Sequence, residues 1–303
     1  MQKIWFITGA SRGLGLEIAQ AALRAGDRVV ATARDRRHVN ARLGPDSAQL
    51  LTVDLDVSRA DQVQAAVDAA LAKFGTIDVL VNNAGYGHLG YFEELTREEI
   101  ATQFATNVFG LFDVTRAVLP SMRAARRGRI FNISSAAGIR GSEFASLYCA
   151  SKFAIEGFSE SLAQELAPFG VFVTLVEPGP FRTDFLSRDS MQLASVAVAD
   201  YDARRGDLRA AFEQRNGKQP GDPLKLAEAI VRLSAESQPP LRFVAGRMAL
   251  DAADAKLAGM AREIEQWREV SIATDFETAE LTTAARANAG QPTSDSALER
   301  WSA

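Results

Sequence analysis

A regular alternation of short apolar runs with longer stretches of helical period constrains the fold of this chain most strongly. Apolar runs rich in Val, Ile and Phe recur at 4–7, 28–31, 50–53, 79–81, 129–133 and 171–176, and amphipathic stretches lie at 14–25, 59–74, 97–122 and 148–169. Strands that are covered on both faces are continuously apolar. Parallel neighbours require crossover connections, which are usually helices. The pattern therefore predicts an α/β fold with a doubly wound parallel sheet of about seven strands and helices on both faces.

The same pattern predicts how the chain is divided. No linker rich in Pro, Gly or Ser interrupts the first 250 residues, so we expect one domain over 1–250 with an irregular helical insertion at about 184–215. Asp222 and Pro223 are typical of a helix start. A last strand is expected at 241–245 and a helix near 249–270. Residues 251–303 form a predicted helical extension and tail. From Thr282 the composition favours a segment that is weakly ordered or ordered only by a partner.

Charge and composition exclude several classes of function. A net charge of −4 gives no basic field for nucleic acid or an anionic membrane. No stretch approaches the roughly 18 apolar residues of a membrane span. The single cysteine, Cys149, fits a reducing compartment, and we interpret it as a buried structural residue. The two histidines, His38 and His88, are far apart, so no metal site is predicted. We expect a cytoplasmic protein that binds a small molecule.

A glycine-rich turn follows the first apolar run and precedes the first helix. Glycines let the backbone turn sharply and approach a ligand closely. The freed N–H groups and the helix N-terminus favour a pyrophosphate. The turn therefore predicts a dinucleotide site. Its candidate cofactor-binding residues are Gly9, Ser11, Arg12, Gly13, Leu14 and Gly15.

The spacing Thr-Gly-x3-Gly-x-Gly in this turn resembles the fingerprint of the short-chain dehydrogenase/reductase family. The similarity recurs at later landmarks over residues 4–184, and these are Asp56, the Asn-Asn-Ala-Gly run at 82–85, Asn107, Ser135, Tyr148, Lys152, Pro178, Gly179 and Thr183. The resemblance implies a Rossmann-like sheet and a nicotinamide cofactor. It also implies cofactor contacts from Asp56, Asn83, Ala84, Gly85, Tyr148, Lys152, Pro178, Gly179 and Thr183. Relatives usually form dimers or tetramers, so a homodimer or homotetramer is expected.

The end of the second apolar run indicates which nicotinamide cofactor is used. An NAD enzyme usually places a carboxylate there to bind the adenosine 2′-hydroxyl. This chain has Ala33 at that position, followed by Arg34, and Arg12 lies in the glycine turn. Arginine suits a 2′-phosphate. We therefore predict NADP rather than NAD, although Asp35 follows directly and is a carboxylate.

Tyr148 and Lys152 are the candidate reacting pair. They are four residues apart in a helical stretch and so share a face. A nearby ammonium stabilises a phenolate, so we expect Lys152 to lower the phenol pKa and make Tyr148 an acid and base near neutrality. The resemblance implies that Lys152 also holds the nicotinamide ribose and that Asn107 positions a water. Ser135, just past a strand, is predicted to donate a hydrogen bond to the substrate oxygen.

The predicted substrate cleft is apolar and aromatic. Its candidate lining residues are Tyr86, Ile139, Phe144, Phe181 and Phe185. We therefore predict an NADP(H)-dependent oxidoreductase that interconverts a hydrophobic ketone or aldehyde and its alcohol, with Tyr148 as general acid and base. Two alternatives stay open. One is a 3-oxoacyl-thioester reductase, and the other is a catalytically inactive protein that senses the dinucleotide.

Overall fold

The computed structural model describes residues 2–187 and 190–276 of the chain. The chain divides into two compact units, of which the first ends at Lys256 and the second begins at Leu257. This boundary falls inside helix α10 (Arg247–Gln266), which contributes to both units. The sheet that the sequence predicts lies wholly in the first unit.

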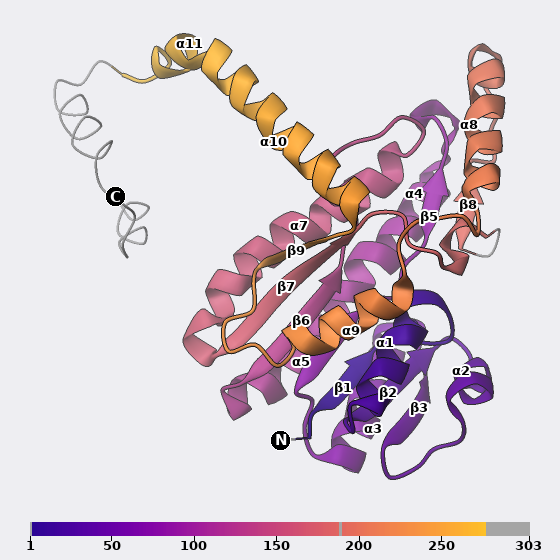
Figure 1. Ribbon diagram of the computed structural model, residues 1–303, viewed down its shortest axis with the longest axis vertical. Coiled ribbons are helices and arrows are strands. Elements are labelled where there is room, and N and C mark those ends of the chain that lie inside the picture. Colours follow the sequence, from indigo (N-terminus) through magenta and orange to yellow (C-terminus); the bar gives the residue numbers. More distant parts are fainter. Residues whose placement is uncertain (1, 188–189, 277–303) are drawn as a thin grey trace. The chain divides into compact units, whose positions relative to one another are not determined.

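Seven parallel strands form the central sheet, which confirms the predicted doubly wound architecture (Figure 1). Their order is β3-β2-β1-β4-β6-β7-β9. Their bounds are β1 Ile4–Ile7, β2 Arg28–Ala33, β3 Leu50–Asp54, β4 Val79–Asn82, β6 Gly128–Ile133, β7 Val171–Pro178 and β9 Arg242–Ala245. In β1, Phe6 pairs with Val30 on one side and with Leu80 on the other. The sheet therefore extends from β1 through β2 to β3 on one side, and from β4 through β6 and β7 to β9 on the other.

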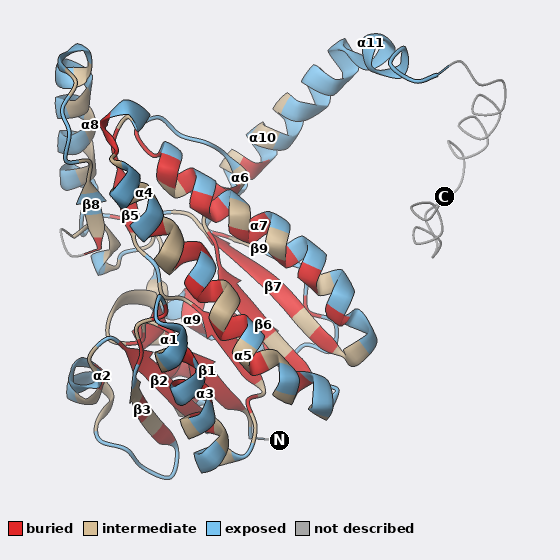
Figure 2. Ribbon diagram, turned by 180° about the vertical axis from the view of Figure 1, so that it is seen from behind, coloured by how far each residue is buried: buried red, intermediate tan, exposed pale blue. Residues whose placement is uncertain are grey.

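Helices bury the two faces of this sheet in separate apolar clusters, as the red strands of Figure 2 show. Trp5 and Ile7 point into one cluster and Phe6 into the other, because side chains alternate along a strand. The first cluster includes residues of α1 (Gly13–Arg24), α2 (Arg36–Leu43) and α9 (Pro223–Leu233). The second includes residues of α3 (Ala60–Phe74), α5 (Gly110–Ala125) and α7 (Ser146–Leu166).

The long amphipathic stretch at 97–122 differs from the single regular helix expected there. It comprises α4 (Arg97–Phe104), a π-helical turn over Ala105–Phe109, and α5. The π turn inserts one extra residue per turn and changes which side chains face the core. As a result Asn107 is buried inside this turn. Hydrophobic period alone could not locate this irregularity.

A small two-stranded sheet and a further helix stand above the carboxyl ends of the main strands. β5 (Gly87–Leu89) pairs in parallel with β8 (Met191–Leu193), which belongs to the predicted insertion. Helix α8 (Asp202–Arg215) follows and has no buried residue. It is held by ion pairs from Arg204 to Glu143 and from Arg205 to Glu94. Tyr201, just before α8, stacks on Tyr91 with ring centroids 4.1 Å apart.

Beyond β9 the described chain is helical. Helix α10 is followed by the short helix α11 (Arg268–Ile272). The predicted weakly ordered tail from Thr282 lies outside the described residues. Over the part of the chain that the structure describes, no helix is long and apolar enough to cross a membrane. The same residues contain no group of His, Cys, Asp and Glu side chains able to hold a metal ion.

Candidate active site

The site lies where the sheet order reverses, at the carboxyl ends of β1 and β4. Connections from these two strands diverge to opposite sides, which leaves a crevice in a doubly wound sheet. The glycine turn follows β1, and the run 82–85 begins in β4 and continues past it. Ser135 follows β6, and Gly179 follows β7. The topology thus brings the predicted motifs to one edge of the sheet.

Backbone geometry explains the glycines of the turn. Gly9 and Gly13 have φ values of +67° and +56°, a region that side chains rarely adopt. A Cβ atom on Gly15 would lie 2.4 Å from Asn83 Nδ2 and 2.5 Å from the Gly9 carbonyl oxygen. Helix α1 begins directly at this turn and has no acidic residue in its first turn. Its N-terminus therefore suits an anion.

Asn83 braces the glycine turn from the neighbouring strand. Its amide Nδ2 donates hydrogen bonds to the carbonyl oxygens of Thr8 at 2.9 Å and Gly9 at 3.0 Å. The Thr8 hydroxyl in turn accepts from the backbone N–H groups of Asn83 and Ala84, both at 2.9 Å. Asn83, predicted as a cofactor contact, therefore fixes the shape of the turn with its side chain.

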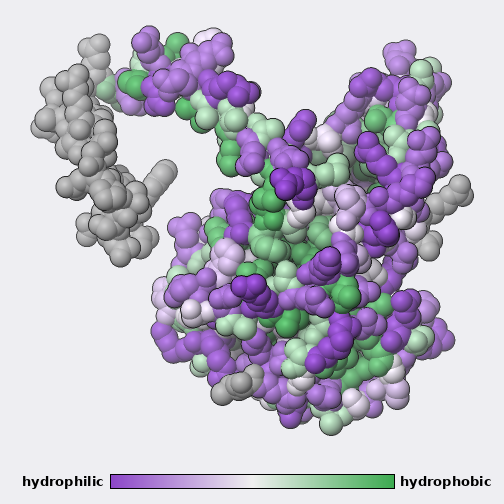
Figure 3. Space-filling view, viewed as in Figure 1, coloured by the Kyte–Doolittle hydropathy of each residue, from purple (hydrophilic) through white to green (hydrophobic). Residues whose placement is uncertain are grey.

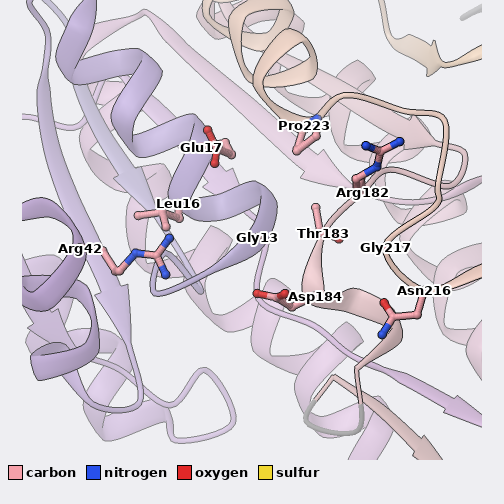
Figure 4. Close-up of a pocket in the computed structure, with 10 residues that line it drawn as sticks. All are labelled: Gly13, Leu16, Glu17, Arg42, Arg182, Thr183, Asp184, Asn216, Gly217 and Pro223. Atoms are coloured by element: carbon pink, nitrogen blue, oxygen red, sulfur yellow. The ribbon is translucent and has the colours of Figure 1, made fainter. Parts of the chain in front are cut away.

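A cavity of about 370 Å³ opens beside the turn (Figure 4). Of the predicted cofactor residues it includes Gly13 and Thr183. Arg42 and Arg182, which the sequence analysis did not single out, add two cationic side chains suited to phosphate. Tyr148 is not among the lining residues, so this cavity is the glycine-turn side of the site. The lining residues are Gly13, Leu16, Glu17, Arg42, Arg182, Thr183, Asp184, Asn216, Gly217 and Pro223.

The segment after β7 packs across to the glycine turn. A Cβ on Gly13 would lie 3.6 Å from Thr183 Cβ, so these two segments are in near contact. The Thr183 hydroxyl caps a short 3₁₀ turn, Asp184–Leu186. Gly179 donates from its backbone N–H to Ala245 at 2.9 Å, and a Cβ there would lie 3.2 Å from the nitrogen of Ala249. The loop is therefore fixed by β9 and by the start of α10.

The end of β2 places Arg34 in solvent, directly after buried Ala33. The adjacent carboxylate of Asp35 caps α2 and forms a bidentate pair with Arg37. Hydrogen bonds from Arg37 lower the pKa of Asp35 to about 2. The Asp35 carboxylate therefore already accepts hydrogen bonds from Arg37, rather than being open to a ribose hydroxyl. Asp56 accepts from the Ser58 hydroxyl at 2.7 Å and so shapes the turn before α3.

Ser135, Tyr148 and Lys152 come together at the end of β6 and the start of α7. Ser135 caps the short helix α6 (Ala136–Ile139), and its side chain is close enough to the Tyr148 phenol to affect the pKa of that group. The Lys152 ammonium nitrogen lies 5.7 Å from the centre of the Tyr148 ring. It donates to the carbonyl oxygen of Ile133 at 2.7 Å. The predicted shared helix face is therefore present, with the ammonium anchored to the adjoining strand.

The pKa values of this pair differ from the expectation that Lys152 lowers the pKa of Tyr148. Burial raises the pKa of Tyr148 to about 12, and the hydrogen bond with Ser135 only partly opposes this rise. Burial also lowers the pKa of Lys152 to about 8, with the Glu156 carboxylate acting in the opposite direction. Desolvation dominates both groups.

Asn107 forms hydrogen bonds with the backbone of Tyr86, beside the site. Its Oδ1 accepts from the N–H of Tyr86 at 3.1 Å, and its Nδ2 donates to the Tyr86 carbonyl at 3.0 Å and to Ser151 Oγ at 3.2 Å. A Cβ on Gly85 would lie 3.2 Å from Asn107 Oδ1. The π-helical turn thus holds the segment after β4 against α7.

A partly buried ionic network behind Lys152 was not expected from the sequence. Glu156, one helical turn beyond Lys152, accepts a hydrogen bond from Ser134. Arg242 of β9 pairs with Glu156, Glu160 and Glu177. Burial and the neighbouring Glu156 raise the pKa of Glu177 to about 7. These residues are far apart in sequence, so no local motif indicated that they meet.

The predicted substrate residues separate into different environments. Phe185 lies against Tyr148 with ring centroids 5.7 Å apart, and the buried hydroxyl of Tyr86 has no hydrogen-bond partner among the described residues. Phe144 is buried with Leu89 and Cys149, as expected for that cysteine, in an apolar cluster at the start of α7. Ile139 is half-buried on α6.

Phe181 is placed differently from the other candidates. Its ring packs on Gly221, where a Cβ would lie 2.6 Å away, and it contacts the apolar cluster beneath the sheet. Phe181 thus packs against the body of the fold, whereas Phe185 lies against Tyr148. His88, on β5, is paired with Glu99 at 3.5 Å.

Together these features define a dinucleotide-binding α/β oxidoreductase. The family model described as short chain dehydrogenase matches residues 3–193. The chain belongs to this family, and it is an NAD(P)-dependent oxidoreductase.

Three curated relatives illustrate what the chain is similar to. "Oxidoreductase BOA17" of Botryotinia fuckeliana is 39% identical over 90% of this chain and 100% of its own length. "3-ketodihydrosphingosine reductase" of Bacteroides thetaiotaomicron is 39% identical over 80% of this chain and 88% of its own. "Retinol dehydrogenase 8" of Homo sapiens is 39% identical over 78% of this chain and 79% of its own.

Solved structures agree with the fold. A short-chain dehydrogenase from Streptomyces avermitilis superposes with a TM-score of 0.84 at 38% identity, covering 91% of this chain and 100% of its own. The structure "ElxO with NADP Bound" superposes with a TM-score of 0.65 at 26% identity, covering 79% of this chain and 94% of its own. The chain therefore shares its seven-stranded α/β fold with these solved structures.

Proposed function

We propose that this protein is an NADP(H)-dependent oxidoreductase that interconverts a hydrophobic ketone or aldehyde and its alcohol. The observation that carries the proposal is the convergence of Ser135, Tyr148 and Lys152 at the sheet edge that also bears the glycine turn. The bound cofactor would supply or accept the hydride. The remaining chemistry falls to these side chains.

Tyr148 is proposed to exchange the proton. In the reducing direction the carbonyl carbon gains a hydride, its oxygen takes the phenolic proton of Tyr148, and a phenolate remains. A phenol whose pKa lies near 12 is protonated throughout the neutral range, which suits a proton donor. We assign to the Ser135 hydroxyl a hydrogen bond to the same oxygen, and to the Lys152 ammonium the stabilisation of the phenolate.

Three features support NADP over NAD. Arg34 stands where an acid would bind a 2′-hydroxyl, and it is exposed. Asp35, the neighbouring carboxylate, is occupied by Arg37 and by the cap of α2. Arg42 and Arg182 lie in the cavity beside the glycine turn and can donate to a phosphate, although Glu17 and Asp184 balance their charge there. Structural neighbours are named with NADP and with NADH bound, so the preference rests on these residues of the chain.

An apolar substrate fits the surroundings of Tyr148. Phe185 stacks near its ring, and the cluster of Leu89, Phe144, Ala145 and Cys149 lies beside the start of α7. Met191, Leu193, Leu208 and Phe212 extend this cluster from the insertion and α8. The names of two relatives, a 3-ketodihydrosphingosine reductase and a retinol dehydrogenase, refer to hydrophobic molecules.

The decisive measurement is oxidation of NADPH against a panel of hydrophobic ketones and aldehydes. Tyr148→Phe should lower kcat by about 10²- to 10⁴-fold, because general acid catalysis contributes that much. Tyr201→Phe is the matched control, since that phenol bonds only the exposed Glu93. Near-native turnover by Tyr148→Phe would refute the assigned proton donor.

The two alternatives give different results in the same assay. A 3-oxoacyl-thioester reductase would turn over acetoacetyl thioesters faster than plain ketones. A dinucleotide-sensing protein would bind NADPH without turning over any carbonyl. The intact set Asn107, Ser135, Tyr148 and Lys152 favours turnover.

A further inference from the structure

Two carboxylates lie buried behind Lys152. Figure 3 shows hydrophilic side chains, in purple, over much of the surface that it views, whereas Glu156 and Glu177 are only 6% and 0% exposed. Charged side chains are almost never fully buried unless they are paired. Removing a carboxylate from water costs free energy that an ion pair only partly returns, so stability alone does not account for such a group. We therefore consider what these carboxylates do for the adjoining active site.

Glu156 shares one face of α7 with the two residues that are proposed to react. Tyr148, Lys152 and Glu156 follow one another at intervals of four residues, so they lie on successive turns of the same helix face. This face meets residues 133–135 at the end of β6. The Glu156 carboxylate accepts a hydrogen bond from the Ser134 hydroxyl, and Lys152 donates to the carbonyl oxygen just before Ser134, at 2.7 Å.

The glycine at position 138 leaves room for the contact between Glu156 and Ser134. A Cβ atom on Gly138 would lie 2.6 Å from Ser134 Oγ and 2.8 Å from Glu156 Oε1. The backbone N–H of Ser134 donates to the Val176 carbonyl oxygen of β7 at 2.8 Å. The carboxylate therefore joins α7 to the segment that carries Ser135, at a point already fixed to the sheet.

The charge of Glu156 acts on Lys152. One Glu156 oxygen accepts from Ser134 and the other from Arg242, and charge-assisted bonds of this kind suit an ionised carboxylate. Burial lowers the pKa of Lys152, and the Glu156 carboxylate opposes that change, because a nearby negative charge favours the ammonium form. The titratable and charged groups around these two residues are Tyr148 and Glu160 on α7, Glu177 on β7 and Arg242 on β9.

We propose that Glu156 is a positioning residue of the reductase: it places a negative charge near the Lys152 ammonium and braces the segment that carries Ser135. It acts through Ser134 and Lys152 rather than on the reacting atoms. The inference rests on the proposed function, because it assigns no separate reaction to this carboxylate.

Titration of Lys152 by NMR tests the effect of this charge without any turnover. In protein labelled with ¹³C at the lysine Cε atoms, the resonance that is missing from Lys152→Arg reports the ionisation of Lys152. Its midpoint should move to lower pH in Glu156→Gln, by about one pH unit, since the amide carries no charge. Glu156→Asp restores the charge and should restore the midpoint. Glu165→Gln, exposed on the same helix, is the matched control and should leave the midpoint in place. An unchanged midpoint in Glu156→Gln would overturn the proposal.

Steady-state kinetics tests the brace. Glu156→Gln and Gly138→Ala should each lower kcat by about 10- to 100-fold, because small displacements of reacting groups cost that much. The KM of the carbonyl substrate should change little, since neither residue belongs to the proposed apolar site. Gly157→Ala is the control for the glycine variant, because a Cβ there meets nothing within 4 Å. Circular dichroism confirms that each variant is folded, and Gly138→Ala tests the brace with every charge intact. Native kcat in Gly138→Ala would refute the brace.

This proposal and the proposed function fail in different ways. Absence of NADPH-dependent turnover in the unmodified protein would contradict the proposed function, and the lysine titration would still decide whether the charge of Glu156 acts on Lys152. Loss of turnover in Tyr148→Phe, with native kcat in both Glu156→Gln and Gly138→Ala, would leave the proposed function in place and contradict the positioning role.

Discussion

The reacting residues illustrate how far residue types and spacing determine chemistry. The four-residue interval from Tyr148 to Lys152 correctly predicted a shared helix face, because helix geometry is local. The pKa values depend on burial, which sequence does not show. Desolvation raises the pKa of Tyr148 to about 12 and lowers that of Lys152 to about 8. The charge state of the lysine, rather than that of the tyrosine, therefore changes near working pH.

This difference predicts the alkaline side of the pH profile. Lys152 carries its charge below about pH 8 and loses it above. The reductase kcat should therefore fall with an apparent pKa near 8, as stabilisation of the phenolate is lost. Lys152→Arg stays charged and should move this limb to higher pH, although at a lower rate. A limb that remained at the same pH in the arginine variant would show that another group controls it.

Arg34 makes the cofactor proposal testable at one position. Arg34→Asp should lower the ratio of kcat/KM for NADPH to that for NADH by about 10- to 100-fold, since a charge-assisted contact contributes roughly 1.5–3 kcal/mol. Arg232→Asp, an exposed arginine on α9, is the control for net charge and should leave the ratio unchanged. If the ratio of kcat/KM for NADPH to that for NADH were equal in both variants, Arg34 would not recognise the 2′-phosphate.

At the level of elements, regular strands and helices were predicted better than irregular ones. Helix α2 was missed because only Val39 is buried in it, so it has no apolar stripe. Three-residue strands such as β5 and β8 are too short for a period to appear. The π turn at Ala105–Phe109 is similarly invisible in the pattern, yet it positions Asn107. Irregular local geometry is therefore concentrated around the site.

The glycine turn gives a prediction at this scale. Gly15→Ala would place a methyl group 2.4 Å from Asn83 Nδ2, so the brace and the turn cannot both keep their positions. Dinucleotide affinity should fall at least about tenfold, with roughly 1–3 kcal/mol lost in stability. Gly157→Ala is the control, because a Cβ there meets nothing within 4 Å. Tight binding of NADPH by Gly15→Ala, measured by fluorescence titration, would contradict the close approach.

For the whole molecule, the doubly wound parallel sheet followed from the rhythm of apolar runs, but the contacts that join distant segments did not. Glu156, Glu177 and Arg242 come from α7, β7 and β9, and they meet only once the sheet is complete. No spacing rule connects residues separated by so much chain. The network ties the last strand of the sheet to the helix that carries Tyr148.

The raised pKa of Glu177 links this network to the stability of the fold. Because its folded pKa of about 7 exceeds its ordinary value, its contribution is complete at low pH and is lost as pH rises through 7. Glu177→Gln should therefore reduce the fall in Tm between pH 5.5 and 8, by about 2 °C for each kcal/mol involved. Glu160→Gln, the exposed partner of Arg242, should keep the fall. Identical pH dependence of Tm in the Glu177 variant and the unmodified chain would refute the linkage.

Helix α8 is attached to the body by two half-buried apolar side chains, Leu208 and Phe212, and by ion pairs, and Tyr201 just before it stacks on Tyr91. Its Arg204–Glu143 pair is open to solvent, whereas Glu94 in the second pair is fully enclosed. Salt in solution weakens the exposed Arg204–Glu143 pair far more than the enclosed Arg205–Glu94 pair. Because the apolar substrate proposed above would bind beside this helix, its KM should change with ionic strength.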